Sequence, residues 1–84
     1  MFNIEWSSEA GYQLSKLEHS DIKRIIHKME KAADNPTHYF KRLTGRNEWK
    51  LRVGDYRVIV RLNISKKRIF VVTLGHRKTI YKEV

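Results

Sequence analysis

Basic residues lie two or four positions apart in two neighbouring segments of the chain, where they could bind and stabilise an anion. The first segment contains Lys50 and Arg52, the second contains Arg57 and Arg61, and Gly54-Asp55 lies between them. The positions between the cations are mostly apolar, and this period of two predicts a pair of half-buried strands. Gly-Asp is a credible two-residue turn, so the two segments should form an antiparallel hairpin.

The register of this hairpin decides which side chains meet. With Val53 opposite Tyr56, the further pairs are Arg52 with Arg57, Lys50 with Ile59, and Glu48 with Arg61. Directly opposed residues share a face of the sheet. One face then carries Lys50, Arg52, Arg57 and Arg61, and the other carries Trp49, Leu51, Val53, Tyr56, Val58 and Val60.

Two arginines opposite each other, as expected for Arg52 and Arg57, repel unless an anion lies between them. We therefore favour a site for a phosphate or carboxylate on this face. The alternative is a face that carries charge for solubility and to prevent edge pairing. Such a face should carry both positive and negative side chains. The one acid here is Glu48, the expected salt-bridge partner of Arg61.

The C-terminal segment adds further candidate residues. Arg77 directly follows a strand-like run, so its guanidinium could reach the open rim of the sheet. Tyr81 comes one turn later if the tail is helical, although a tyrosine there could equally fill the core. The candidate general bases are Lys50, Tyr81 and His76, of which His76 is expected mainly to pack. The four histidines, at positions 19, 27, 38 and 76, lack the spacing of metal ligands, so no metal site is expected.

Composition bounds the class of protein. The 84 residues should form one domain, spanning 1–84, and 40% hydrophobic residues suffice for a packed core. Eighteen Lys and Arg against nine Asp and Glu give a net charge of +9. This excess predicts a polyanionic partner (nucleic acid, an acidic protein or a membrane surface) or else a merely soluble basic protein. The absence of cysteine excludes disulfides, and a cytoplasmic protein is expected because no signal peptide or membrane span is evident.

Hydrophobic periods predict the elements that position these residues. Residues 2–6 alternate like a strand, and Ser7-Ser8 offers N-cap candidates for a short helix. A second helix, capped by Ser20, should end before Asn35-Pro36. Its basic face is interpreted either as solvated or as a phosphate-contacting surface. After a loop over 37–48, strands are expected at 49–53, 56–63 and 68–74, the last one central and covered on both faces.

These elements predict an α+β fold with the order β-α-α-β-β-β. The sheet is expected to be small, four-stranded and rich in antiparallel pairs, with the first strand joining a hairpin meander. Both N-terminal helices should pack on one face, which leaves the other face at least partly open.

Two segments together resemble the signature of RelE-type toxins. Residues 43–60 are LTGRNEWKLRVGDYRVIV, and residues 72–81 are VTLGHRKTIY. The family pattern is roughly L-x-G, aromatic-K/R-L-R-V-G-D-Y-R-V-I-Y, followed by V-L-H-R-K-D-I-Y. The resemblance covers essentially the whole chain, which is identified on this basis as a member of the RelE branch of the RelE/ParE superfamily.

The resemblance implies cleavage of messenger RNA in the ribosomal decoding site, by attack of a ribose 2′-OH on the neighbouring phosphate. Arg57 and Arg77 correspond to arginines that hold and stabilise the scissile phosphate. Lys50 corresponds to a lysine on the same face, and Tyr81 to a tyrosine that stacks on a base or assists proton transfer. Glu48 departs from the pattern, because some members have a second lysine there, and this weakens the transfer of a lysine-based acid–base pair. A second departure replaces a consensus aromatic residue by valine at position 60.

The leading expectation is a metal-independent, ribosome-dependent mRNA endonuclease that arrests translation as the toxin of a type II toxin–antitoxin system. The alternative is a ParE-like, non-enzymatic inhibitor of DNA gyrase with the same fold. A plain basic nucleic-acid-binding module would leave the Arg-Arg-Tyr combination unexplained. The expected partners are an acidic, partly disordered RelB-like antitoxin, the ribosome and mRNA, with no membrane and no small-molecule cofactor. Besides the catalytic candidates, the residues expected to contact RNA or the ribosome are Arg52, Arg61, Lys23, Arg24, Lys28, Lys41, Arg42 and Arg46.

Overall fold

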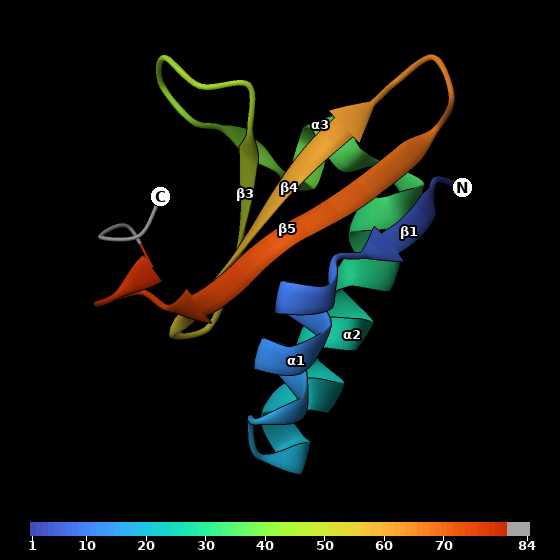
Figure 1. Cartoon of the computed structure of the whole chain (residues 1–84). Helices are drawn as coiled ribbons and strands as arrows, with labels where there is room; N and C mark the ends of the chain where they lie inside the picture. The colour runs from blue at the N-terminus through green and yellow to red at the C-terminus, as the bar shows by residue number, and fades with distance from the viewer. Residues whose placement is uncertain (81–84) are drawn as a thin grey trace.

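The computed structural model describes residues 1–80, which form a single sheet with helices on one side (Figure 1). The elements of this part of the chain are β1 (Asn3–Trp6), α1 (Ser8–Ser15), α2 (His19–Asp34), α3 (Pro36–Tyr39), β2 (Lys41–Arg42), β3 (Trp49–Val53), β4 (Tyr56–Asn63) and β5 (Arg68–His76). The strand order is β1-β5-β4-β3-β2, with β1 parallel to β5 and the other neighbours antiparallel. The α+β class and the first strand's place in the sheet are thus confirmed.

The prediction of four strands was wrong, because the sheet has a fifth strand. Residues 37–48, expected to be a loop, contain part of α3 and all of β2. Lys41 of β2 pairs with Lys50, and Arg42 with Trp49. Elements of four and two residues are too short to show a period. Pro36 begins α3 at a position where its missing N–H removes no helical hydrogen bond.

The two longer helices begin differently. Ser7 caps α1 as predicted, since its Oγ accepts a hydrogen bond from the N–H of Ala10 at 3.0 Å. The expected cap by Ser20 was wrong: α2 begins at His19 after Glu18, which makes no side-chain cap hydrogen bond. The predicted end before Asn35-Pro36 is confirmed, because α2 ends at Asp34.

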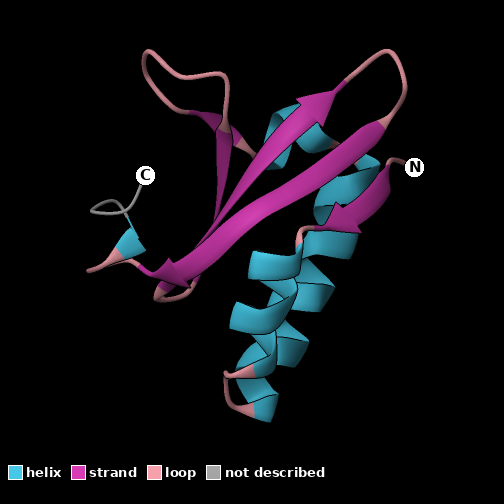
Figure 2. Ribbon diagram, viewed as in Figure 1, coloured by secondary structure: helices cyan, strands magenta, loops and turns pink. Residues whose placement is uncertain are grey.

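The core lies between the helices and one face of the sheet (Figure 2). Its fully buried residues are Ala10, Ile25, Met29, Ala32 and Ala33 from the helices and Leu51, Val53, Val58, Val60, Ile69, Val71 and Leu74 from the sheet, together with Phe40. Burying each large aliphatic side chain contributes about 1.5–3 kcal/mol. This burial holds both helices on the apolar face. Within residues 1–80, no helix is long and apolar enough to cross a membrane.

Strand β5 lies inside the sheet, between β1 and β4, but it is not covered on both faces along its whole length. Ile69 and Val71 are fully buried on the helix side, whereas Phe70, opposite Arg61, is 37% exposed. The prediction of a strand covered on both faces was therefore wrong at this end. Near the other end Ile80 is buried, and a Cβ added at Gly75 would lie 3.3 Å from its Cδ1. The segment after β5 thus covers Gly75.

Candidate nucleic-acid interface

The β3–β4 hairpin has the register predicted from the sequence. Its Cα partners include Val53 with Tyr56, Arg52 with Arg57, and Lys50 with Ile59. Leu51 and Val58, which face the helices, are buried, whereas Arg52 on the other side is exposed. We call the side that carries Lys50, Arg52, Arg57 and Arg61 the cationic face.

Arg57 is held against the hairpin turn by two hydrogen bonds to the backbone. Its Nη1 donates to the carbonyl oxygen of Gly54 at 2.9 Å and to that of Tyr56 at 2.8 Å. Within residues 1–80 no carboxylate pairs with Arg57, and no further hydrogen bond of its guanidinium is found. The backbone therefore orients this guanidinium, whose remaining donors can meet phosphate oxygens in a bidentate arrangement.

Arg77 lies at the same turn. Its backbone N–H donates to the carbonyl oxygen of Asp55 at 2.7 Å, and its Nε lies 3.4 Å from Asp55 Oδ1. Both side chains are more than half exposed. Ion pairs between such exposed groups are weak, so a phosphate can compete with Asp55 for this arginine.

Lys50 and Arg57 line a cavity of about 510 Å³ at the edge of β3. Its lining residues are Lys28, His38, Tyr39, Lys41, Lys50, Leu51, Arg52, Gly54 and Arg57, and we call it the α3 pocket. It opens where β2, which pairs only with Trp49 and Lys50, leaves the rest of β3 uncovered. The pocket brings two predicted catalytic residues together with three predicted RNA-contacting ones, Arg52, Lys28 and Lys41.

Arg61 and Arg46 lie outside this pocket and flank the carboxylate of Glu48. Arg61 Nη2 is 3.6 Å from Glu48 Oε2, which confirms the predicted salt bridge. Arg46 Nε is 3.4 Å from Oε1 of the same carboxylate, a contact that the sequence analysis missed. The two predicted RNA-contacting arginines thus form a separate, partly neutralised cluster on the loop before β3 and on β4.

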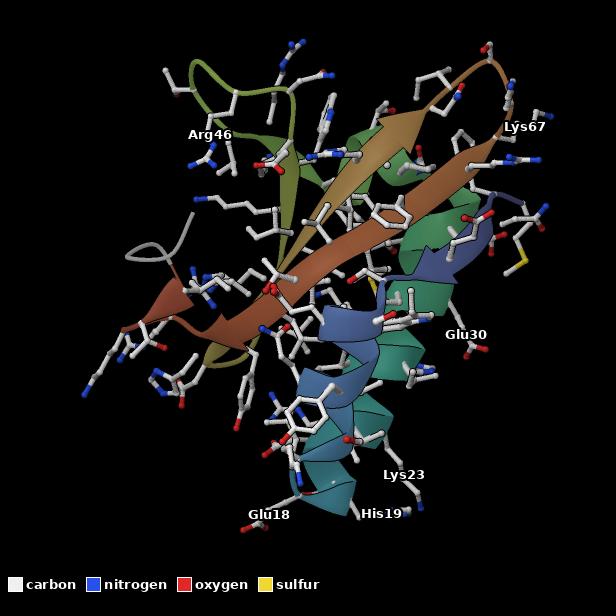
Figure 3. The ribbon with its side chains drawn as sticks, viewed as in Figure 1. Glu18, His19, Lys23, Glu30, Arg46 and Lys67 are labelled. Carbon is white, nitrogen blue, oxygen red and sulfur yellow. The ribbon has the colours of Figure 1, made fainter. Side chains whose placement is uncertain are left out.

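The remaining predicted RNA-contacting residues are dispersed. Lys23 points away from the sheet at the N-terminal end of α2, far from Arg46 (Figure 3). Arg24 lies 3.9 Å from Asp21 and against Gly54, while Arg42 is exposed on β2. The structure does not bring these three side chains into the α3 pocket.

His76 lies on the opposite side of the sheet from Lys50 and Arg57. It is the strand partner of Tyr56, whose ring it contacts edge-on with centroids 5.9 Å apart. Its Nδ1 accepts a hydrogen bond from the N–H of Lys78 at 3.1 Å. This position agrees with a packing role for His76. Tyr81, the other candidate base besides Lys50, lies outside the described residues.

Tyr56, which contacts His76 on the helix side of the sheet, also contacts α2. Its hydroxyl donates to Asp21 Oδ2 at 3.4 Å. Burial is the main cause that raises the pKa of Tyr56 above its ordinary value of 10.0, followed by the charge of Asp21, the hydrogen bond to it, and the charges of Glu18 and Asp55. Tyr56 is therefore a neutral hydrogen-bond donor that fixes the hairpin to α2.

His38 and Tyr39 are two further site residues that were not predicted from the sequence. Both belong to α3 and lie within residues 37–48, which were expected to be a loop. Both line the α3 pocket. A sequence signal existed for the helix, since Asn35 precedes a proline that can begin a helix. Nothing local indicated that its rings would lie beside the lysines. Among residues 1–80, no three His, Cys, Asp or Glu side chains are grouped in a way that could hold a metal ion.

The model of the family described as ParE toxin of the type II toxin–antitoxin system, parDE, matches residues 4–81. The chain belongs to this toxin family. It is therefore a toxin of the RelE/ParE superfamily, as the sequence resemblance predicted. No curated protein matches the toxin.

Several solved structures share the toxin's fold. They include the RelBE2 toxin–antitoxin complex of Mycobacterium tuberculosis, with a TM-score of 0.81 and 18% identity over 90% of the toxin and 98% of that chain. The intact RelBE complex of E. coli has a TM-score of 0.76 and 20% identity over 90% and 96%. The YoeB/ParE toxin of Agrobacterium tumefaciens has a TM-score of 0.76 and 15% identity over 89% and 98%. At these identities the likeness establishes the fold.

Proposed function

We propose that the toxin is an endoribonuclease that cleaves messenger RNA in the ribosomal A site and so arrests translation. One observation carries the proposal: Lys50 and Arg57 line one cationic pocket, and Arg77 is anchored at the same hairpin turn. The shared fold with RelE toxins supports it.

Transesterification is the chemistry that suits this arrangement. The ribose 2′-oxygen attacks the adjacent phosphorus, and the bond from phosphorus to the 5′-oxygen breaks, which leaves a 2′,3′-cyclic phosphate and a 5′-hydroxyl. In this proposal, Arg57 and Arg77 neutralise the dianionic pentacoordinate phosphorus between these steps. Lys50 is assigned the transfer of one proton, either the one lost by the 2′-OH or the one gained by the 5′-oxygen.

Dependence on the ribosome follows from what this site offers. Among residues 1–80, no carboxylate lines the α3 pocket. Glu48 occupies the position of a second lysine and is engaged with Arg46 and Arg61. Because Lys50 is the one lysine assigned to the reaction and no acid–base pair is found among the described lining residues, positioning of the message by the ribosome has to supply much of the rate acceleration.

An acidic antitoxin is the second part of the proposal. Structures of similar fold are RelB–RelE complexes. The net charge of +9 suits an acidic, partly disordered chain that folds as it binds. Co-purification with the product of the adjacent gene tests this part, and elution as two separate species would exclude it.

Inhibition of DNA gyrase is the second candidate function, because the family model that matches the chain is that of ParE toxins. The two functions differ in their requirement for Arg57 and Arg77. Expression of Arg57→Ala and Arg77→Ala should no longer arrest growth if the toxin is a nuclease, whereas Arg68→Ala, an exposed arginine at the far end of β5, should remain toxic. Toxicity that survives the first two substitutions, with loss of supercoiling in a gyrase assay, would favour the ParE-like function.

A further inference from the structure

The α3 pocket contains residues for which the cleavage chemistry has no use. Lys28 comes from α2, His38 and Tyr39 from α3, and Lys41 from β2. Strand β2 lies at the edge of β3, and α2 and α3 lie on the helix side of the sheet. Lys50 and Arg57, by contrast, belong to the cationic face. The pocket therefore continues from the proposed cleavage site around the edge of the sheet.

The positive charge of this extension is not balanced within the described part of the chain. Lys28 and Lys41 form no ion pair with a carboxylate of residues 1–80, and no acid lines the pocket. By contrast, carboxylates lie 3.4–3.9 Å from Arg24, Arg46, Arg61 and Arg77. A cluster of cations without acids attracts an anionic ligand.

An aromatic pair adjoins these lysines. The rings of His38 and Tyr39 stand at 88° to each other with centroids 4.9 Å apart. Tyr39 is partly buried against the core and supports the exposed His38. Flat side chains beside basic ones bind single-stranded nucleic acid, because the bases stack on the rings while the cations neutralise the phosphates. An acidic peptide would use the lysines but would not need an exposed ring.

We propose that the α3 pocket is a subsite for one nucleotide of single-stranded RNA next to the scissile phosphate. Its base stacks on His38, which Tyr39 supports, and its phosphate lies between Lys28 and Lys41. The inference rests on the proposed function, because Lys50 and Arg57, assigned to the scissile phosphate, line the same pocket. The cavity of about 510 Å³ is within the range of small-ligand sites.

The test is the affinity of the full-length toxin for a fluorescent 2′-O-methylated decanucleotide, which cannot be cleaved because it lacks the attacking hydroxyl. His38→Ala should weaken binding about five- to a hundredfold, the range for loss of one stacked base. Lys28→Ala and Lys41→Ala should each weaken binding and reduce the salt-dependence slope by about 0.7. His19→Ala on α2 and Lys66→Ala in the turn between β4 and β5 remove exposed residues outside the pocket and are matched controls that should bind normally.

Abasic substitution at each position of the oligonucleotide then locates the stacked base. The wild-type toxin should lose affinity at one position, and His38→Ala should lose no further affinity there. Unchanged RNA binding by the three pocket variants would overturn the subsite. So would RNA binding that stays normal while antitoxin binding is lost, because the pocket would then take an acidic peptide. The proposed function is tested separately by Arg57→Ala: loss of A-site cleavage in that variant would leave the nuclease assignment standing even without the subsite.

Discussion

Arg77 contacts Asp55 twice, through its backbone N–H to the Asp55 carbonyl oxygen at 2.7 Å and through Nε to Oδ1 at 3.4 Å. Arg57 donates to the carbonyl oxygen of Gly54, the preceding turn residue. The two arginines assigned to the scissile phosphate are therefore anchored to consecutive residues of one turn. Arg57 is held by backbone oxygens alone, whereas Arg77 also meets a carboxylate that an incoming phosphate must displace.

Asp55→Asn should raise the affinity for single-stranded RNA about two- to fivefold, because an exposed carboxylate no longer competes for Arg77. The backbone hydrogen bond remains, so the free energy of unfolding should change by less than about 1 kcal/mol. Fluorescence anisotropy with the 2′-O-methylated decanucleotide and urea unfolding measure the two effects. A tenfold loss of RNA affinity would show instead that Asp55 positions Arg77 for the phosphate.

Gly54→Ala should destabilise the toxin by about 1–2 kcal/mol in urea unfolding, because alanine is strained at a positive φ. Gly54 has φ +56°, and a Cβ there would lie 2.5 Å from Nη2 of Arg24, the end of a flexible and exposed side chain that can move aside. Gly11→Ala is the matched control: it has ordinary helical backbone and nothing within 4 Å of the added Cβ, so it should stabilise the toxin by about 0.5–1 kcal/mol. If Gly54→Ala proved neutral, the turn geometry described above would be incorrect.

The raised pKa of Tyr56 predicts a pH dependence at the alkaline end. The fold favours the protonated phenol, so this contribution to stability is present below pH 10 and is lost as pH rises through the folded pKa. Ultraviolet titration should show a tyrosine that ionises above pH 10 and disappears in Tyr56→Phe. Tyr12→Phe, which removes an exposed tyrosine, should retain this phase. A late phase that persisted in Tyr56→Phe would belong to another residue.

Glu48→Gln should destabilise the toxin by about 1–2 kcal/mol, between the values for exposed and buried ion pairs, because Arg46 and Arg61 lose their shared carboxylate. The side chain of Glu48 is 12% exposed, against 42% and 61% for the two arginines. Glu30→Gln, an exposed substitution on α2, should change stability by less than about 0.5 kcal/mol. A double-mutant cycle with Arg61→Ala measures the coupling between Glu48 and Arg61. If the two changes in the free energy of unfolding added within error, this ion pair would not contribute to stability.

The hairpin was predictable because its signals are local. The alternation of apolar and basic residues on either side of Gly54-Asp55 determines the register of the hairpin. This register alone places Arg52 opposite Arg57. The expected partnership of Glu48 with Arg61 followed from the same register. The resemblance to RelE-type toxins gave the family, which the match over residues 4–81 confirms.

The α3 pocket was not predictable from local pattern. β2 consists of two exposed residues and α3 of one short turn, so neither has a hydrophobic period. His38 comes beside Lys28 and Lys41 only because α3 packs on α2 and β2 pairs with β3. The start of α2 was misassigned because Ser20 is a strong cap by type, whereas the helix is preceded by Glu18 and begins two residues earlier than a cap at Ser20 would place it.

We propose above all that the toxin cleaves message in the ribosomal A site through Arg57 and Arg77. The most direct measurement is in vitro translation of a defined message with purified toxin, followed by primer extension to map breaks. We predict breaks within A-site codons that require ribosomes, disappear in Arg57→Ala and Arg77→Ala, and persist in Arg68→Ala. Full-length message with undiminished translation by the wild-type toxin would contradict the claim and direct attention to DNA gyrase.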